Sequence, residues 1–259
     1  MKLDNLQVKS VSVSFGGVQA VRNVSFTVEP GRIVGLIGPN GAGKSSLLNC
    51  ISGLSRPDAG SVMLGSKELV GLRPDQIAEC GLGRVFQHPE VIGELSVLDN
   101  LLVACHRNLQ FSVLSEMLGL PSVRQAEMKA REEVEKVARL VGLHESLQMN
   151  AASLPYGHRK LLELGRVILL GSKLLLLDEP IAGLNEAEIE QLAQLIMTLR
   201  SKGNLSVLLV EHNMGLVRQL CDEAVVLDAG QVIAQGTPEQ VLNDPKVLLA
   251  YLGEVVENA

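Results

Sequence analysis

The stretch GPNGAGKS, residues 38–45, has glycines, a lysine and a serine at spacings suited to holding phosphate groups. It follows the apolar run 33–38 and opens a predicted helix over 44–52, which is the setting of the phosphate-loop pattern G-x-x-x-x-G-K-[ST]. Glycines let backbone N–H groups turn towards phosphate oxygens, and the helix start adds partial positive charge. We expect Lys44 to reach the β- and γ-phosphates and the Ser45 hydroxyl to bind Mg²⁺. The predicted nucleotide-binding residues are Gly38, Pro39, Asn40, Gly41, Ala42, Gly43, Lys44, Ser45 and Ser46.

A second stretch, KLLLLDEP over residues 173–180, places two carboxylates at the end of an apolar run. Open α/β sheets bind ligands at the carboxyl ends of their strands, where Asp178 would lie. Asp178 could hold Mg²⁺ through water, and Glu179 could act as general base towards an attacking water, a role worth roughly 10²–10⁴-fold in rate. An Asp-Glu pair after a strand is otherwise an ordinary turn, but a phosphate loop in the same chain favours the catalytic interpretation.

The pattern of apolar residues predicts the elements that position these side chains. Residues 6–15 alternate in polarity and turn at 16–17 into a second strand, which indicates an antiparallel β layer. Short apolar runs separated by helices then favour a parallel sheet covered on both faces. Further helices are expected over 74–80, 122–142, 186–200 and 213–220, and further strands near 61–64, 84–86, 173–178, 206–210 and 223–228.

Residues 90–152 contain no buried strand pattern, so we interpret them as a helical insertion in the α/β core. Ser96 with Asp99 predicts the cap of one helix there. The predicted organisation is a domain over 1–236, with its core at 1–89 and 153–236, followed by a helical extension over 237–259. Thr237 to Gln240 fits a capping box with Pro238 at the first helical position.

Composition narrows the class of protein. The 259 residues carry a net charge of −6, which gives no support to nucleic acid as a partner. The apolar runs are far shorter than the roughly 18 residues of a membrane span, and the N-terminal residues show no secretory signal, so we expect a cytoplasmic location. The four cysteines are scattered without a metal or disulfide spacing.

The sequence LPYGH lies at residues 154–158, twenty residues before the Asp-Glu pair. In this respect the chain resembles the ATP-binding-cassette ATPases, which carry a signature, usually LSGGQ, at the same place. The resemblance implies a P-loop NTPase core with an antiparallel β layer and an inserted α-helical subdomain. Other family marks follow in order along nearly the whole chain. Phe15 stands where the family has an aromatic residue that stacks on adenine. Gln87 lies in the loop that leads to the insertion and takes the place of a glutamine that binds Mg²⁺. AGLN follows at 182–185, and His212 takes the place of the switch histidine at the γ-phosphate.

In that family two ATPases pair head to tail, so the signature of one faces the ATP held by the other. The resemblance therefore assigns Leu154, Pro155, Tyr156, Gly157 and His158 to a partner's nucleotide, with Tyr156 and His158 at the rim. Pro155 suits the first turn of the following helix, and Ser153 could cap it. Asn185 stands where Asp is usual and could cap helix 186–200 with Glu188. Phe15 as a core aromatic, and Gln87 and His212 as ordinary surface residues, are the alternatives.

Within the family the chain looks like the ATPase subunits of branched-chain amino-acid importers. Four features carry this resemblance: the LPYG signature, the insertion FSVLSEMLGLPSVRQAE (111–127), EHNM (211–214) and GTPEQVLNDPKVLLAYLGE (236–254). It implies an ATP hydrolase that needs ATP and Mg²⁺ and works at the inner face of the cell membrane. Its implied partners are permease subunits, a second and different ATPase subunit, and indirectly a solute-binding protein. The alternatives are a urea or short-amide importer, a soluble ATPase of the family without transport, and a P-loop kinase.

Overall fold

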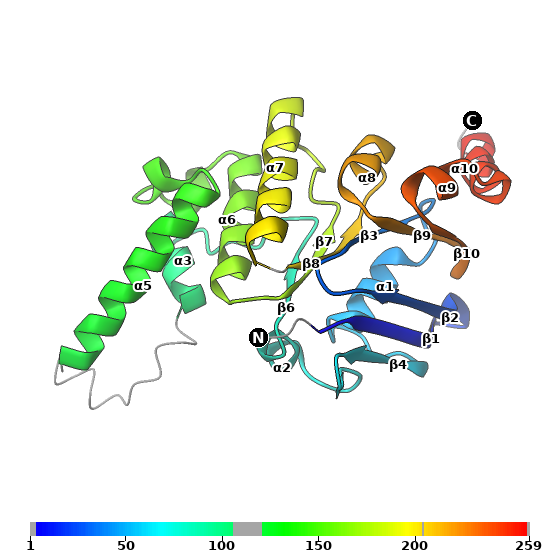
Figure 1. The fold of residues 1–259 in the computed structure, drawn as a ribbon, viewed down its shortest axis with the longest axis horizontal. Helices are drawn as coiled ribbons and strands as arrows, with labels where there is room; N and C mark the ends of the chain where they lie inside the picture. Colours follow the sequence, from blue (N-terminus) through cyan, green and yellow to red (C-terminus); the bar gives the residue numbers. More distant parts are fainter. Residues whose placement is uncertain (1–3, 106–120, 204, 258–259) are drawn as a thin grey trace. The chain divides into compact units, whose positions relative to one another are not determined.

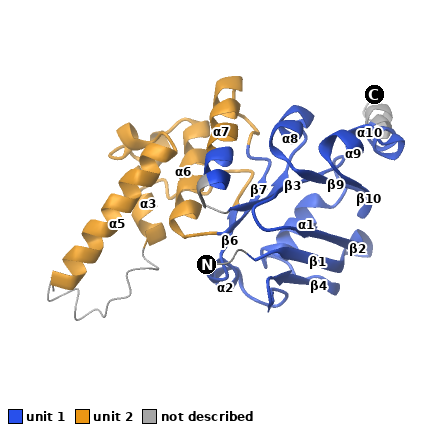
Figure 2. Cartoon of the chain, viewed as in Figure 1, with its two compact units in different colours: residues 1–84, 173–180, 196–259 blue, residues 85–172, 181–195 orange. Residues whose placement is uncertain are grey.

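The computed structural model describes residues 4–105, 121–203 and 205–257, coloured along the sequence in Figure 1. The chain forms two compact units (Figure 2). The first comprises residues 1–84, 173–180 and 196–259, and the second comprises residues 85–172 and 181–195. Among the residues described, no helix is both long enough and apolar enough to cross a membrane.

A four-stranded antiparallel sheet opens the first unit, in the order β2-β1-β4-β5. Its strands are β1 Leu6–Phe15, β2 Val18–Val28, β4 Ala59–Leu64 and β5 Lys67–Glu68. Residues of β1 alternate between buried and exposed positions, as expected of a sheet with one face on the core. The predicted antiparallel layer is confirmed.

The second sheet of this unit has the order β10-β9-β3-β8-β7-β6. Its strands are β3 Ile33–Ile37, β6 Leu82–Val85, β7 Leu174–Asp178, β8 Ser206–Val210, β9 Glu223–Asp228 and β10 Gln231–Gly236. Strand β3 pairs in parallel with β8 and β9, and β7 pairs in parallel with β8, whereas β10 runs antiparallel to β9. Every residue of β3, β7 and β8 is buried, which explains why their sequences are mostly apolar.

The helices of the first unit are α1 Lys44–Ile51, α2 Pro74–Glu79, α8 Met214–Leu220, α9 Pro238–Leu242 and α10 Pro245–Glu257. One apolar core contains residues of both sheets and of α1, among them Val8, Leu36, Leu47 and Leu176. The capping box of α9 is present, with Gln240 N–H donating to Thr237 Oγ1 and Thr237 N–H donating to Gln240 Oε1. This cap is therefore confirmed.

The second unit is helical. It contains α3 Val97–Cys105, α5 Pro121–Leu140, α6 Tyr156–Leu169, two short 3₁₀ turns at His144–Ser146 and Ala151–Ser153, and the first part of α7 Glu186–Gly203. A Cβ at Gly165 of α6 would lie 3.0 Å from Leu101 Cδ2 of α3, so this glycine permits close helix packing. Ser96 Oγ accepts from Asp99 N–H at 3.0 Å, which confirms the predicted cap of α3.

Four details differ from the sequence predictions or are left untested by the structure. Strand β6 ends at Val85 instead of continuing to residue 86, because the Phe86 N–H donates to the Glu163 carboxylate. Strand β10 was not predicted, since its half-exposed residues lack a clear alternation. The domain boundaries stay a prediction, and residues 111–120 of the long insertion lie outside the described part of the chain.

Candidate active site

The phosphate loop connects β3 to α1 in the first unit. Gly38 and Gly43 both have positive φ, +147° and +99°, in regions that L side chains rarely adopt. A Cβ at Gly38 would collide with the carbonyl oxygen of Leu227, and one at Gly43 with that of Ala20. These two positions therefore need glycine both for conformation and for space, and the loop shape follows from the sequence.

The Lys44 ammonium lies inside this loop. Nζ donates to the carbonyl oxygens of Gly38 and Pro39, at 2.8 Å each, and the residue is only 6% exposed. Gly43 occupies the N-cap of α1 and offers no side chain to its first N–H groups, so phosphate oxygens can serve as their acceptors. The loop surrounds a cavity of about 190 Å³. Its lining residues are Ala20, Asn40, Gly41, Ala42, Gly43, Lys44, Ser45, Ser46, Glu179 and His212.

Glu179 and His212 meet at this cavity. Glu179 follows β7, His212 follows β8, and their Oε1 and Nε2 atoms are 2.9 Å apart. Glu179 has a φ of +47°, which is strained for a residue other than glycine, and its N–H donates to the Val210 carbonyl of the neighbouring strand. A strained backbone held by the strands points this carboxylate at the phosphate loop. Asn213, and not His212, caps α8, because its Oδ1 accepts from the Leu216 N–H.

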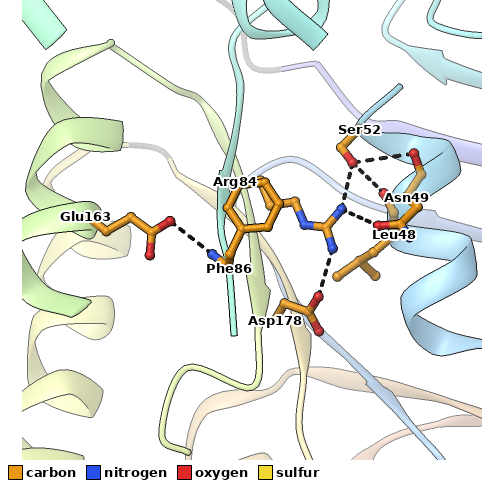
Figure 3. Close-up of polar contacts among 7 residues, drawn as sticks. All are labelled: Leu48, Asn49, Ser52, Arg84, Phe86, Glu163 and Asp178. Atoms are coloured by element: carbon orange, nitrogen blue, oxygen red, sulfur yellow. Dashed lines mark hydrogen bonds and ion pairs between the residues drawn. The ribbon is translucent and has the colours of Figure 1, made fainter. Parts of the chain in front are cut away.

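Asp178, one residue earlier, is buried and paired with a residue that the sequence analysis missed. Its Oδ2 accepts from Nη2 of Arg84 in β6 at 2.8 Å, and the two side chains are 9% and 8% exposed (Figure 3). Nη1 of Arg84 also donates to Asn49 Oδ1 and Ser52 Oγ of α1, at 2.8 Å each. The guanidinium therefore links α1, which follows the phosphate loop, to Asp178 at the end of β7.

A Mg²⁺ ion fits this donor set. Ser45 lines the cavity with a hydroxyl, and carboxylates are the other oxygen ligands that Mg²⁺ prefers. Asp178 does not line the cavity and is already bound to Arg84, so its contact with a metal would pass through water. Phe15, at the end of β1, is 52% exposed, which contradicts the alternative of a core aromatic and leaves its ring accessible to a base.

The second unit carries Gln87 and the signature residues. Gln87 is exposed and follows β6, and its carbonyl accepts a hydrogen bond from the Tyr156 hydroxyl at 3.0 Å. The hydroxyl thus bonds to the chain's own loop, a contact that the sequence analysis did not foresee. Leu154 and Gly157 are buried, His158 is half-buried and Pro155 is exposed.

The cap of α6 differs from the prediction. Pro155 itself occupies the N-cap, with φ −53° and ψ 154°, and Ser153 does not cap the helix, because its hydroxyl donates to the Asn150 carbonyl in the preceding 3₁₀ turn. Asn185 does cap α7. Glu188 N–H donates to Asn185 Oδ1 at 3.0 Å, and Asn185 N–H donates to Glu188 Oε2 at 2.9 Å.

Glu188 of this cap lies directly beside Gly157 of the signature. A Cβ at Gly157 would lie 2.5 Å from Glu188 Oε1, a distance that real Cβ atoms essentially never show. A side chain at this position would therefore have to displace the Glu188 carboxylate from the cap of α7. A charge inside an apolar strand, such as Arg84 in GLGRVF, is the signal that could have revealed its buried partner.

Comparisons with known proteins identify the family of the chain. A family model described as ABC transporter matches residues 21–182, and one described as Branched-chain amino acid ATP-binding cassette transporter matches residues 231–257. The high-affinity branched-chain amino acid transport ATP-binding protein LivG of Escherichia coli K12 is 42% identical over 96% of this chain and 98% of its own. The lipopolysaccharide export system ATP-binding protein LptB of Acidithiobacillus ferridurans is 33% identical over 96% and 97%.

Among solved structures, the ADP conformation of MJ1267, an ATP-binding cassette of an ABC transporter, matches with a TM-score of 0.82 and 31% identity. The match covers 97% of this chain and 100% of that one. The predicted fold class and the predicted family are both confirmed. The chain belongs to the ATP-hydrolysing ATP-binding subunits of the ABC transporter family.

Proposed function

We propose that this chain powers the import of branched-chain or related amino acids, as one of two ATPase subunits bound to permease subunits at the inner face of the cell membrane. The observation that carries the ATPase part is the Glu179–His212 contact of 2.9 Å at the phosphate-loop cavity. The substrate part rests on residues 231–257, which match the branched-chain amino acid family model, because overall identity alone also relates the chain, at 33%, to an exporter ATPase.

In this proposal the chain's own residues bind ATP and activate water. The loop N–H groups and Lys44 hold the phosphates, Phe15 stacks on the base, and Ser45, Asp178 and Gln87 hold Mg²⁺, which neutralises phosphate charge when bound. Glu179 takes the proton of the attacking water. His212 keeps the Glu179 carboxylate in one orientation by its hydrogen bond and senses the γ-phosphate.

The signature residues Leu154 to His158 would face the nucleotide of a partner ATPase. Pro155, where LSGGQ has Ser, has neither a hydroxyl nor a backbone N–H to donate to phosphate oxygens, and His158 replaces the Gln amide with an imidazole. A homodimer would carry this loss at both sites, which favours pairing with a different subunit. A solute-binding protein would deliver the amino acid to the permeases.

Uptake of labelled leucine tests the proposal. A strain lacking this gene should lose leucine uptake, the unmodified gene should restore it, and the gene carrying Glu179→Gln should not. His212→Ala should retain ATP binding and melting temperature but lose most turnover. Loss of urea or acetamide uptake in place of leucine uptake would support the alternative substrate, and unchanged uptake of all three would indicate an ATPase without this transport role.

A further inference from the structure

One face of α6 holds the main chain of the loop that carries Gln87. The Tyr156 hydroxyl donates to the Gln87 carbonyl at 3.0 Å, and Glu163 Oε1 accepts from the Phe86 N–H at 3.2 Å (the latter in Figure 3). Residues 156 and 163 are seven positions apart, so they lie two turns apart on the same side of the helix. Arg166, three positions further on, donates to the Glu90 carbonyl.

All three contacts end on backbone atoms of residues 86–90, and none of them uses the Gln87 side chain. They bind the residue before Gln87, Gln87 itself and a residue three positions after it. Because the backbone is held at residues 86, 87 and 90, the Gln87 side chain leaves it in one direction. Residues 86–90 therefore depend on α6 for their shape.

The Tyr156 ring makes a second connection. A Cβ at Gly183, where φ is +78°, would lie 3.1 Å from Tyr156 Cε1, so the ring packs directly on the backbone of the loop before α7. The Lys160 ammonium lies 5.4 Å from the centre of the same ring. Tyr156 thus contacts both the Gln87 loop, through its hydroxyl, and the loop that contains Gly183, through its ring.

Glu163 is an unusual residue for the interior of a helical unit. It is 4% exposed, and its Oε2 atom has no hydrogen-bond partner among the residues that the structure describes. Burying a carboxyl group is unfavourable, and an apolar side chain would fill the space at lower cost. The bond to the Phe86 N–H is the contact that an apolar residue could not make.

We propose that Tyr156 and Glu163 are positioning residues for ATP hydrolysis: they hold residues 86–90 so that Gln87 leaves the loop in one direction, and Tyr156 links that direction to the loop around Gly183. This inference rests on the proposed function, in which Gln87 takes part in hydrolysis. It accounts for the tyrosine of the signature by contacts within its own unit, and none of these contacts involves a nucleotide.

The test compares full-length variants that differ by few atoms. Tyr156→Phe keeps the ring and removes the donor, whereas Tyr156→Leu removes both. Glu163→Leu removes the acceptor, and Glu163→Gln retains an oxygen at this position. Glu94→Gln changes an exposed carboxyl group of the same unit and serves as the matched control.

Two measurements are made on each variant: hydrogen exchange of the peptide covering residues 85–92, and the kcat and KM for Mg-ATP. A net hydrogen bond corresponds to about a threefold to tenfold change in an equilibrium. We expect Tyr156→Phe and Glu163→Leu to speed exchange and lower kcat by about that factor, with KM and ATP affinity unchanged. Glu163→Gln should restore most of both values, and Glu94→Gln should match the unmodified chain.

Unchanged exchange in both Tyr156→Phe and Glu163→Leu would overturn the inference whatever Gln87 does. Faster exchange with normal kcat would also overturn it, provided that Gln87→Ala lowers kcat. If Gln87→Ala itself leaves kcat unchanged, the proposed role of Gln87 is wrong and the positioning role in hydrolysis is wrong with it. In that case faster exchange would show only that α6 anchors the loop.

Discussion

Replacing Arg84 by Met should destabilise the chain strongly, because it leaves the Asp178 carboxylate buried without its cation. The two side chains are 8% and 9% exposed and 2.8 Å apart. Two unit charges about 4 Å apart attract by about 4 kcal/mol at an effective dielectric constant near 20. Removing one partner of such a buried pair costs about 3–5 kcal/mol in measured cases. The bonds from Arg84 to Asn49 and Ser52 are lost as well.

Urea unfolding without nucleotide and with EDTA measures this cost, since neither ATP nor metal then adds binding energy to the folded state. With an m value of about 3 kcal/mol/M, the midpoint should fall by roughly 1 M or more. The matched control is Arg73→Met. The Arg73–Asp75 pair is even shorter, 2.6 Å, but its side chains are 71% and 62% exposed, so its loss should have little effect.

Adding Asp178→Asn to Arg84→Met should recover much of the lost stability, because the second change removes the unpaired charge. Mg²⁺ should raise the midpoint of Arg84→Met more than that of the unmodified chain if Asp178 also holds the metal. A loss no larger than that of Arg73→Met, or strictly additive effects in the double variant, would refute the reasoning about burial.

Three further predictions follow from the site and its partners. Glu179→Gln should abolish steady-state hydrolysis with ATP affinity retained, and Lys44→Ala should weaken ATP affinity itself; normal turnover by Glu179→Gln would show that the general base lies elsewhere. Burial raises the pKa of Glu163 from 4.5 to about 7, although the Phe86 N–H and Arg166 lower it. The backbone of Glu90 also lowers this pKa, and the Glu90 carboxylate raises it. The folded state then binds more protons than the unfolded state between these values, so the free energy of unfolding should fall by about 3 kcal/mol as the pH rises from 4.5 to above 7. Glu163→Gln should flatten that slope in urea titrations, and an equal slope in both proteins would contradict the assignment. The isolated chain should sediment mainly as a monomer with Mg-ATP in the Glu179→Gln form, whereas a tight homodimer at micromolar concentration would show that Pro155 and His158 do not weaken pairing.

The parts of the site that the sequence predicted depend on residues close together in the chain. The phosphate loop is defined by eight consecutive positions, and the glycines at 38 and 43 are required by backbone shape and space. The Asn185–Glu188 cap needs only a spacing of three residues. Such patterns fix both the residue types and their geometry, so the sequence is sufficient.

The contacts that the sequence could not predict join distant residues. Arg84 and Asp178 are 94 positions apart, Tyr156 and Gln87 are 69 apart, and Glu179 and His212 are 33 apart. The family resemblance placed Tyr156 and His212 near nucleotides but gave neither its neighbour. The predicted cap of α6 is wrong for a local reason. Ser153 belongs to the 3₁₀ turn before the helix, so Pro155 occupies the N-cap.

In the proposed function the signature serves two purposes that constrain each other: it faces a partner's nucleotide, and it makes contacts within its own chain. A side chain at position 157 would displace the Glu188 carboxylate, which the cap of α7 holds beside Gly157. Tyr156 connects the same turn of α6 to the loops around Gln87 and Gly183. A substitution at either position would change contacts within this chain as well as the proposed contact with a partner's nucleotide. Loss of activity after such a substitution is thus evidence about pairing only when the exchange of residues 85–92 is unchanged.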